Sequence, residues 1–133
     1  MAGEQYRYTL VIGEDAPERA WLEDILMRGG LEVAACSEAE LLATPDIVPP
    51  QLVVLDDARL PGFGAEARRA DCEARIATLD RIRAQPAIAG VPLIVLAEGA
   101  DIDSFSAAIE HGASAYLVKP AAAEEVVRIA HKI

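Results

Sequence analysis

The sequence predicts an α/β domain built on a buried parallel sheet, and two observations lead to this prediction. Short apolar runs bounded by turn residues alternate along the chain with segments whose apolar residues recur at helical spacing. The runs are continuously apolar, which is typical of strands covered by helices on both faces. A length of 133 residues, with 53% hydrophobic and 26% charged residues, suits one packed domain, so we treat residues 1–133 as a single unit.

The first half of the chain predicts three strands and two helices. Apolar runs lie at three places, 8–12, 31–36 and 52–55. After the first run, apolar residues over 21–26 recur at helical spacing, and Gly29 ends that helix. Ser37 and Glu40 have the spacing of a capping box, so a short helix begins there. Three prolines over 44–50 predict the loop that leads to the third strand.

The second half continues the alternation. Two further apolar runs predict strands at 93–96 and 116–118. Helical stripes precede each of them, formed by Cys72, Ile76, Leu79 and Ile82 in one case and by Phe105, Ala108 and Ile109 in the other. The second of these helices ends at Gly112, and a last helix is expected from Ala122 to about Ile133.

Five strands and five helices in strict alternation predict a flavodoxin-like, doubly wound parallel sheet of strand order 2-1-3-4-5. In such sheets a ligand site forms outside the carboxyl ends of the strands. The candidate site residues are therefore those that follow each strand: Gly13, Glu14, Asp15, Asp56, Asp57, Ala97, Glu98, Lys119 and Pro120. Several carboxylates and one lysine are expected to meet at this edge.

Carboxylates that converge on a rigid edge suit a hard cation such as Mg²⁺, which takes one or two carboxylates and keeps several waters. A carboxylate can also attack phosphorus as a nucleophile, while a metal ion and a lysine ammonium neutralise the phosphoryl oxygens. The alternative is that these acids are solvated turn residues and that Lys119 pairs with one of them.

Charge and composition exclude several other classes of function. With 12 basic and 22 acidic residues the net charge is −10, and no basic patch is present, so neither nucleic acid nor a membrane surface is an expected partner. The longest apolar run, 91–97, is too short to span a membrane, and residues 1–8 do not have the pattern of a signal peptide. Two distant cysteines, Cys36 and Cys72, are expected to be reduced thiols in a cytoplasmic protein.

Three segments resemble the receiver domains of two-component response regulators, of the chemotaxis-receiver type. They are residues 57–62 (DARLPG), residues 111–120 (HGASAYLVKP) and the spacing of Arg19, Leu22, Leu26 and Gly30. The resemblance covers nearly the whole chain. It implies a phosphoryl acceptor at Asp57, a metal ligand at Glu14 and a third ligand in the backbone carbonyl of Arg59. It also implies that Lys119 contacts the acceptor, and that the Lys119-Pro120 bond is cis.

The acceptor position is ambiguous between two neighbouring aspartates. Counting back from Leu60-Pro61 selects Asp57, whereas counting forward from Pro50 selects Asp56, because this chain has one extra residue between these landmarks. Successive side chains of a strand point to opposite faces, so only one of the two aspartates faces the site. We favour Asp57 and keep Asp56 as the alternative.

Three departures from the receiver pattern weaken the predicted site. Gly13 stands where receivers carry the first of two acids, which weakens Mg²⁺ binding, and a register shifted by one makes Asp15 a further candidate ligand. Ala97 stands where a serine or threonine hydroxyl reports phosphorylation, and Glu98 adds negative charge beside the site. Tyr116 matches a switch tyrosine, but next to Ala97 we expect weak coupling and a ring packed at the surface.

The segment 63–77 is longer than the receiver pattern requires. The extra residues are expected either to lengthen the third helix or to form a loop over the acidic edge. Arg68 and Arg69 lie in this segment. They either approach the acidic site or, as a charged helix face would, lie in solvent.

The sequence thus supports a receiver module that accepts a phosphoryl group on an aspartate from a histidine kinase or phosphotransfer protein and signals to an effector protein. Dimerisation is a habit of that family. The alternative is a pseudo-receiver that binds partners without being phosphorylated. A phosphatase or nucleotide-binding protein of similar topology is the third reading, but Gly13-Glu14-Asp15-Ala16 lacks the paired aspartates of the former and the glycine-rich turn of the latter. No enzymatic turnover is expected.

Overall fold

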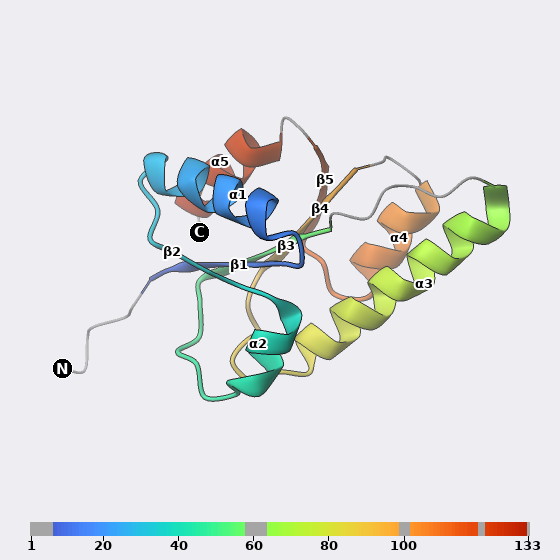
Figure 1. Ribbon diagram of the computed structural model, residues 1–133, viewed down its shortest axis with the longest axis horizontal. Helices are drawn as coiled ribbons and strands as arrows, with labels where there is room; N and C mark the ends of the chain where they lie inside the picture. Colours follow the sequence, from blue (N-terminus) through green and yellow to red (C-terminus); the bar gives the residue numbers. More distant parts are fainter. Residues whose placement is uncertain (1–6, 58–63, 99–101, 120–121, 133) are drawn as a thin grey trace.

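The computed structural model describes residues 7–57, 64–98, 102–119 and 122–132, in which strands and helices alternate (Figure 1). The strands are β1 (Thr9–Gly13), β2 (Val33–Cys36), β3 (Leu52–Asp56), β4 (Leu93–Ala97) and β5 (Ala115–Val118). The helices are α1 (Ala16–Arg28), α2 (Glu38–Ala43), α3 (Gly64–Arg83), α4 (Ile102–Glu110) and α5 (Ala122–Lys132). No helix in the described ranges is long and apolar enough to cross a membrane.

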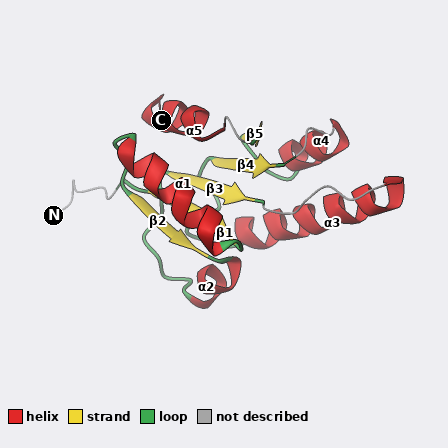
Figure 2. Ribbon diagram, turned by 45° about the horizontal axis from the view of Figure 1, so that its top comes forward, coloured by secondary structure: helices red, strands yellow, loops and turns green. Residues whose placement is uncertain are grey.

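The strands form one parallel sheet of order β2-β1-β3-β4-β5, which confirms the predicted fold class and strand order. Helices α1 and α5 cover one face of the sheet, and α2, α3 and α4 cover the other (Figures 1 and 2). Each face has its own apolar core. Leu22 and Leu26 of α1 are fully buried on the first face, and Leu79 and Ile82 of α3 are fully buried on the second.

The helices beside the carboxyl end of β1 begin at residues that satisfy free backbone N–H groups. Asp15 caps α1 by accepting a hydrogen bond from the Glu18 amide, with 3.3 Å between Oδ1 and N. Ser37 and Glu40 form the capping box of α2 that their spacing predicts, with N–O distances of 3.1 and 2.9 Å. These caps fix the two helices that flank the end of β1.

Helix α3 is unusually long, with 20 residues, or about 30 Å at 1.5 Å per residue. Residues 64–77 are therefore helical, and Phe63 lies outside the described residues. Its buried stripe consists of Arg75, Leu79 and Ile82, whereas residues 64–70 are mostly exposed. The first turns of α3 extend past the sheet beside α4 (Figure 1). A charged side chain thus belongs to the face of α3 that packs on the core.

Arg83, the last residue of α3, ties together two loops, the one from α3 to β4 and the one from α4 to β5. Its guanidinium donates to the carbonyl oxygens of Ile88, at 3.0 Å, of Val91 and of Gly112. Gly112 follows α4 with a φ of +104°, a conformation that side chains with a Cβ rarely adopt. A Cβ built on Gly112 would lie 3.0 Å from Nε of Arg83. The position requires glycine both for its backbone conformation and for the approach of Arg83.

We predict that Gly112→Ala lowers the free energy of unfolding by about 1–3 kcal/mol, because it places a Cβ in a strained backbone conformation. Urea denaturation followed by circular dichroism measures this loss. Gly90→Ala is the matched control, since a Cβ there meets nothing within 4 Å and its φ is not positive. Equal losses for the two variants would contradict the assignment.

Candidate functional site

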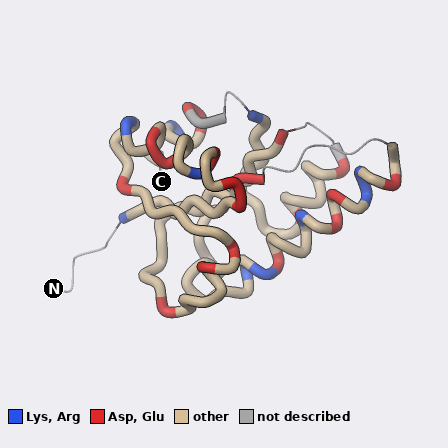
Figure 3. Tube along the Cα trace, viewed as in Figure 1, with Lys and Arg blue, Asp and Glu red and all other residues tan. Residues whose placement is uncertain are grey.

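The candidate site is an acidic cleft of 530 Å³ at the carboxyl ends of β1 and β3. Its lining comes from Ile12, Gly13, Glu14, Asp15, Glu38, Leu55, Asp56, Asp57 and Thr78. Acidic positions gather where β1 passes into α1 (Figure 3). The parallel sheet therefore brings together residues that are more than 40 positions apart in the sequence, as the fold class predicts.

Asp56 is the last residue of β3 and lies opposite Gly13 in the β1–β3 register. Its side chain is 1% exposed, and its Oδ1 lies 2.6 Å from Nζ of Lys119. Its Oδ2 is buried and receives no hydrogen bond within the described part of the chain. Burial raises the pKa of this carboxyl, while the hydrogen bond and charge of Lys119 act in the opposite direction. Asp56 is thus a buried carboxylate with one neutralised oxygen and one unsatisfied oxygen.

Lys119, directly after β5, is the cation that the acids share. Besides pairing with Asp56, its Nζ pairs with Oε1 of Glu18 and lies 3.7 Å from Oε1 of Glu98. It also donates a hydrogen bond to the backbone carbonyl of Asp57 at 3.2 Å. Burial alone lowers the pKa of Lys119, but the hydrogen bonds that its ammonium donates to Asp56 and Glu18 outweigh burial and raise the pKa. Lys119 is therefore a fixed ammonium at neutral pH.

Asp57 points away from Lys119, toward α3. Its Oδ2 forms an ion pair with Nε of Arg75, and both side chains are buried. Burial lowers the pKa of the Arg75 guanidinium, but the hydrogen bond and charge of Asp57 outweigh this and raise it. Nη1 of Arg75 also lies 3.4 Å from the hydroxyl oxygen of Tyr116. Adjacent aspartates thus have different cations, one from β5 and one from α3.

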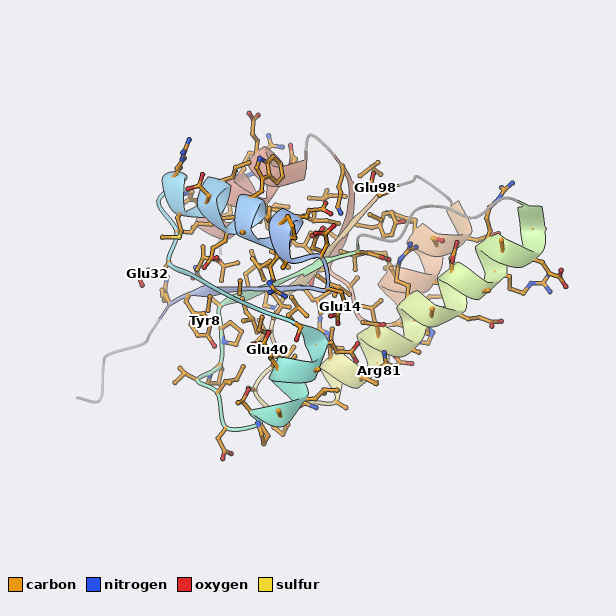
Figure 4. All side chains as sticks on the ribbon, viewed as in Figure 1. Tyr8, Glu14, Glu32, Glu40, Arg81 and Glu98 are labelled. Atoms are coloured by element: carbon orange, nitrogen blue, oxygen red, sulfur yellow. The ribbon has the colours of Figure 1, made fainter. Side chains whose placement is uncertain are left out.

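The loop after β1 is fixed by hydrogen bonds on both sides. Nη1 of Arg19 donates to the carbonyl oxygen of Gly13 at 2.6 Å. Oε1 of Glu14 accepts a hydrogen bond from the Glu38 amide at 3.3 Å, so Glu14 lies beside the start of α2 (Figure 4). Asp15 is the cap of α1 rather than part of a carboxylate pair. Glu14 is therefore the acid of this loop that reaches across the cleft.

The resemblance to receivers implies Mg²⁺, and the donor set fits it in a reduced form. Glu14 and Asp56 supply two carboxylates to the cleft, and Oδ2 of Asp56 is an unsatisfied buried oxygen. Mg²⁺ commonly takes one or two carboxylates and keeps several waters. Among the described residues there is no group of three acidic, histidine or cysteine side chains that could hold a metal ion. Glu14 and Asp56 are the residues that would hold the ion.

The structure brings Glu14, Asp56, Asp57 and Lys119 to one edge, but it places Asp56, not Asp57, against the side chain of Lys119. Arg59, the expected carbonyl ligand, and Pro120, with its expected cis bond, lie outside the described residues. Ala97 is fully buried at the end of β4. Tyr116 was expected at the surface, and that expectation is wrong: the residue is 9% exposed, because α4 and Arg75 cover its ring.

Sequence reasoning missed Arg75 and Glu18. Arg68 and Arg69, the arginines considered from sequence, are exposed and line a separate hollow of 250 Å³ with Ala65, Cys72 and Asp103. A signal for Arg75 was present, because it precedes the buried Leu79 by four residues and so lies on the same helix face. An arginine on a buried stripe indicates a buried anion as its partner.

This fold is that of response-regulator receiver domains. Solved structures with similar folds include a protein described as a response regulator from Chloroflexus aurantiacus, with 27% identity, 96% of this chain and 97% of that chain covered, and a TM-score of 0.66. A CheY-like receiver domain protein from Methanospirillum hungatei has 19% identity, 96% and 93% coverage and a TM-score of 0.67. The chemotaxis protein CheY4 of Vibrio cholerae has 17% identity, 96% and 99% coverage and a TM-score of 0.71. No protein-family model and no curated protein sequence matches the chain.

We predict that Arg75→Met lowers the free energy of unfolding by about 3–5 kcal/mol, because it removes the cation from a buried ion pair. The double variant Arg75→Met/Asp57→Leu should lose less than the sum of the single variants, by about 1–3 kcal/mol. Chemical denaturation of the four proteins gives both quantities. Arg69→Met, on the exposed face of the same helix, is the control and should stay within about 0.5 kcal/mol of the parent. Additive losses would contradict a direct pair.

The raised pKa of Asp56 predicts a specific pH dependence of stability. The folded state holds the Asp56 proton more tightly than the unfolded chain, whose reference pKa is 3.8. The contribution of Asp56 to the free energy of unfolding is therefore fully present below pH 3.8 and is lost as pH rises through the pKa of Asp56 in the folded state. The free energy of unfolding of Asp56→Asn should therefore rise relative to that of the parent as pH increases from 3.5 through the pKa of Asp56 in the folded state. Unfolding curves at successive pH values, with the exposed Asp46→Asn as control, test this, and parallel profiles would contradict it.

Proposed function

We propose that the chain is a receiver module of a two-component system that accepts a phosphoryl group on Asp56. The observation that supports this most directly is the contact between Nζ of Lys119 and Oδ1 of Asp56, beside an Oδ2 that has no donor in the described residues. A buried carboxylate with an unsatisfied oxygen at the edge of a cleft has the position of a nucleophile. The proposal changes the favoured acceptor from Asp57 to Asp56.

In the proposed reaction, an oxygen of Asp56 attacks phosphorus and forms an acyl phosphate, while the bond from phosphorus to the donor atom breaks and the donor keeps the electron pair. Lys119 stays protonated and neutralises charge that develops on the phosphoryl oxygens. Mg²⁺, when bound, would supply further neutralisation of the same oxygens. Glu18 holds Lys119 from the side of α1, so the ammonium is oriented before a donor arrives.

Asp57 is the weaker candidate because its carboxylate is engaged by Arg75. Attack through Oδ2 of Asp57 would require a buried ion pair to open, which costs several kcal/mol. Its backbone carbonyl, in contrast, accepts a hydrogen bond from Lys119 and so helps to position the amine. Asp57 thus supports the proposed site without being its nucleophile.

The upstream partner in this proposal is a histidine kinase or phosphotransfer protein, and the downstream partner is an effector protein. The protein would act in the cytoplasm as a signalling module without catalytic turnover of a substrate. Homodimerisation stays a prediction. A phosphatase or a nucleotide-binding protein of similar topology would instead turn over a phosphoester or retain a nucleotide.

A second candidate is a pseudo-receiver that binds partners without being phosphorylated. Two features favour it: both carboxylate oxygens of Asp56 are buried, and Glu98 lies 3.7 Å from Lys119, where a phosphoryl group would meet its negative charge. Gly13 and Ala97 also lack the carboxylate and the hydroxyl that receivers carry there. A pseudo-receiver keeps the fold and the interaction surfaces but has no acyl phosphate.

The two candidates are separated by incubating the protein with acetyl phosphate and Mg²⁺ and measuring its intact mass. We expect one phosphoryl adduct in the parent and in Asp57→Asn, and none in Asp56→Asn, because Lys119 pairs with the side-chain carboxylate of Asp56 and contacts only the backbone carbonyl of Asp57. Lys119→Met should reduce the adduct by about 10-fold or more, since one unit charge near the transferring group is removed.

Circular dichroism spectra control for folding of each variant. An adduct that forms in Asp56→Asn but not in Asp57→Asn would instead assign Asp57, the residue favoured from the sequence, as the acceptor. The absence of an adduct in the folded parent, with acetyl phosphate and with phosphoramidate, supports the pseudo-receiver instead.

A further inference from the structure

Arg75 of α3 connects two strands that are not neighbours in the sheet. Asp57 directly follows β3, Tyr116 belongs to β5, and β4 lies between these strands. The guanidinium pairs with Oδ2 of Asp57 through Nε and lies 3.4 Å from the Tyr116 hydroxyl through Nη1. Its Cζ lies 5.8 Å from the centre of the Tyr116 ring. One buried cation therefore contacts both an acid of the site and an aromatic ring two strands away.

β4, the strand between β3 and β5, ends in a residue that has no polar side-chain atom. Ala97, the last residue of β4, is fully buried and belongs to the same core cluster as Leu79 and Tyr116. Its methyl group cannot form a hydrogen bond to either side. The polar contact between the end of β3 and β5 is therefore made by Arg75 of α3, because β4 supplies no polar side chain at this point.

The contacts of Arg75 and Tyr116 extend to the surface of the molecule through Phe105. The rings of Tyr116 and Phe105 have centroids 5.9 Å apart and an interplanar angle of 77°, an edge-to-face pair. Phe105 is part of α4 and is 48% exposed. A change in the position of the Tyr116 ring therefore alters the packing of an exposed aromatic side chain.

We propose that Arg75 is a positioning residue that couples the charge of Asp57 to the placement of Tyr116 and Phe105, and so links the acidic cleft to the surface of α4. The ion pair holds the guanidinium against the Tyr116 ring. A loss of charge at Asp57 weakens this hold, and the ring repacks. The inference does not require phosphorylation of Asp56, so it stands or fails separately from the proposed function.

A triple-mutant thermodynamic cycle tests the coupling. In the parent background, the effects of Asp57→Asn and Tyr116→Phe on the equilibrium constant for unfolding should be non-additive by about threefold or more, because both residues contact one guanidinium. In the Arg75→Lys background the two effects should be additive. Lysine keeps the charge near Asp57 but, as a single ammonium group, does not reproduce the planar fork that reaches two partners.

Fluorine NMR of protein labelled with 3-fluorotyrosine reports the Tyr116 ring directly, and Tyr116→Phe assigns its signal among the three tyrosines. Asp57→Asn should shift the Tyr116 signal in the parent background but not in the Arg75→Lys background. If Arg75 had a purely structural role, the response of the signal to Asp57→Asn would be the same in both backgrounds. Arg69→Lys, exposed on the same helix, is the control and should preserve the response. A Tyr116 signal that responds equally in all backgrounds, or additive effects in the parent, overturns the proposal.

Discussion

Two adjacent carboxylates buried at the end of one strand are the constraint on which this site depends. Asp56 and Asp57 point to different sides because strand side chains alternate, so one cation cannot pair with both side chains. Lys119 reaches Asp56 from the residue directly after β5, and Arg75 reaches Asp57 from α3. A buried carboxylate without a cation is strongly unfavourable, so the positions of α3 and of the end of β5 are tied to these two pairs.

This constraint explains features that apolar packing alone leaves unexplained. The buried stripe of α3 contains an arginine because the end of β3 presents a second acid to that helix. Lys119 contacts acids from α1, β3 and the turn after β4, so the carboxyl edge has more negative than positive groups around one ammonium. Such an edge favours additional positive charge, which is the electrostatic condition for binding a cation in the acidic cleft.

The fold was predictable from the sequence because each strand is a continuous apolar run and each helix has its own period, and these signals are local. The site was predictable only in part. Glu14 and Lys119 follow strands whose ends are well defined, so their place at the carboxyl edge followed from topology. The choice between Asp56 and Asp57 did not follow from topology, because the extra residue before Pro61 allows two registers. Counting back from Leu60-Pro61 favours Asp57, whereas the structure places the side chain of Asp56 against Lys119. The helical period places Arg75 on the buried stripe of α3, but it does not identify Asp57 as the partner, because the two residues are 18 positions apart.

The departures from the receiver pattern form a consistent set when they are considered as changes in charge and hydrogen bonding. Gly13 supplies no carboxylate and Ala97 supplies no hydroxyl at the end of β4, whereas Asp57 and Arg75 form an ion pair between the end of β3 and α3. The lysine–aspartate pair, on which the proposed function rests, is present. At the end of β4, where Ala97 has no hydroxyl, the polar contact between the end of β3 and β5 comes from the guanidinium of Arg75 on α3. The ionic contacts of Arg75 therefore connect the acidic cleft to Tyr116 and, through the ring of Phe105, to the surface of α4, where β4 supplies no hydroxyl group.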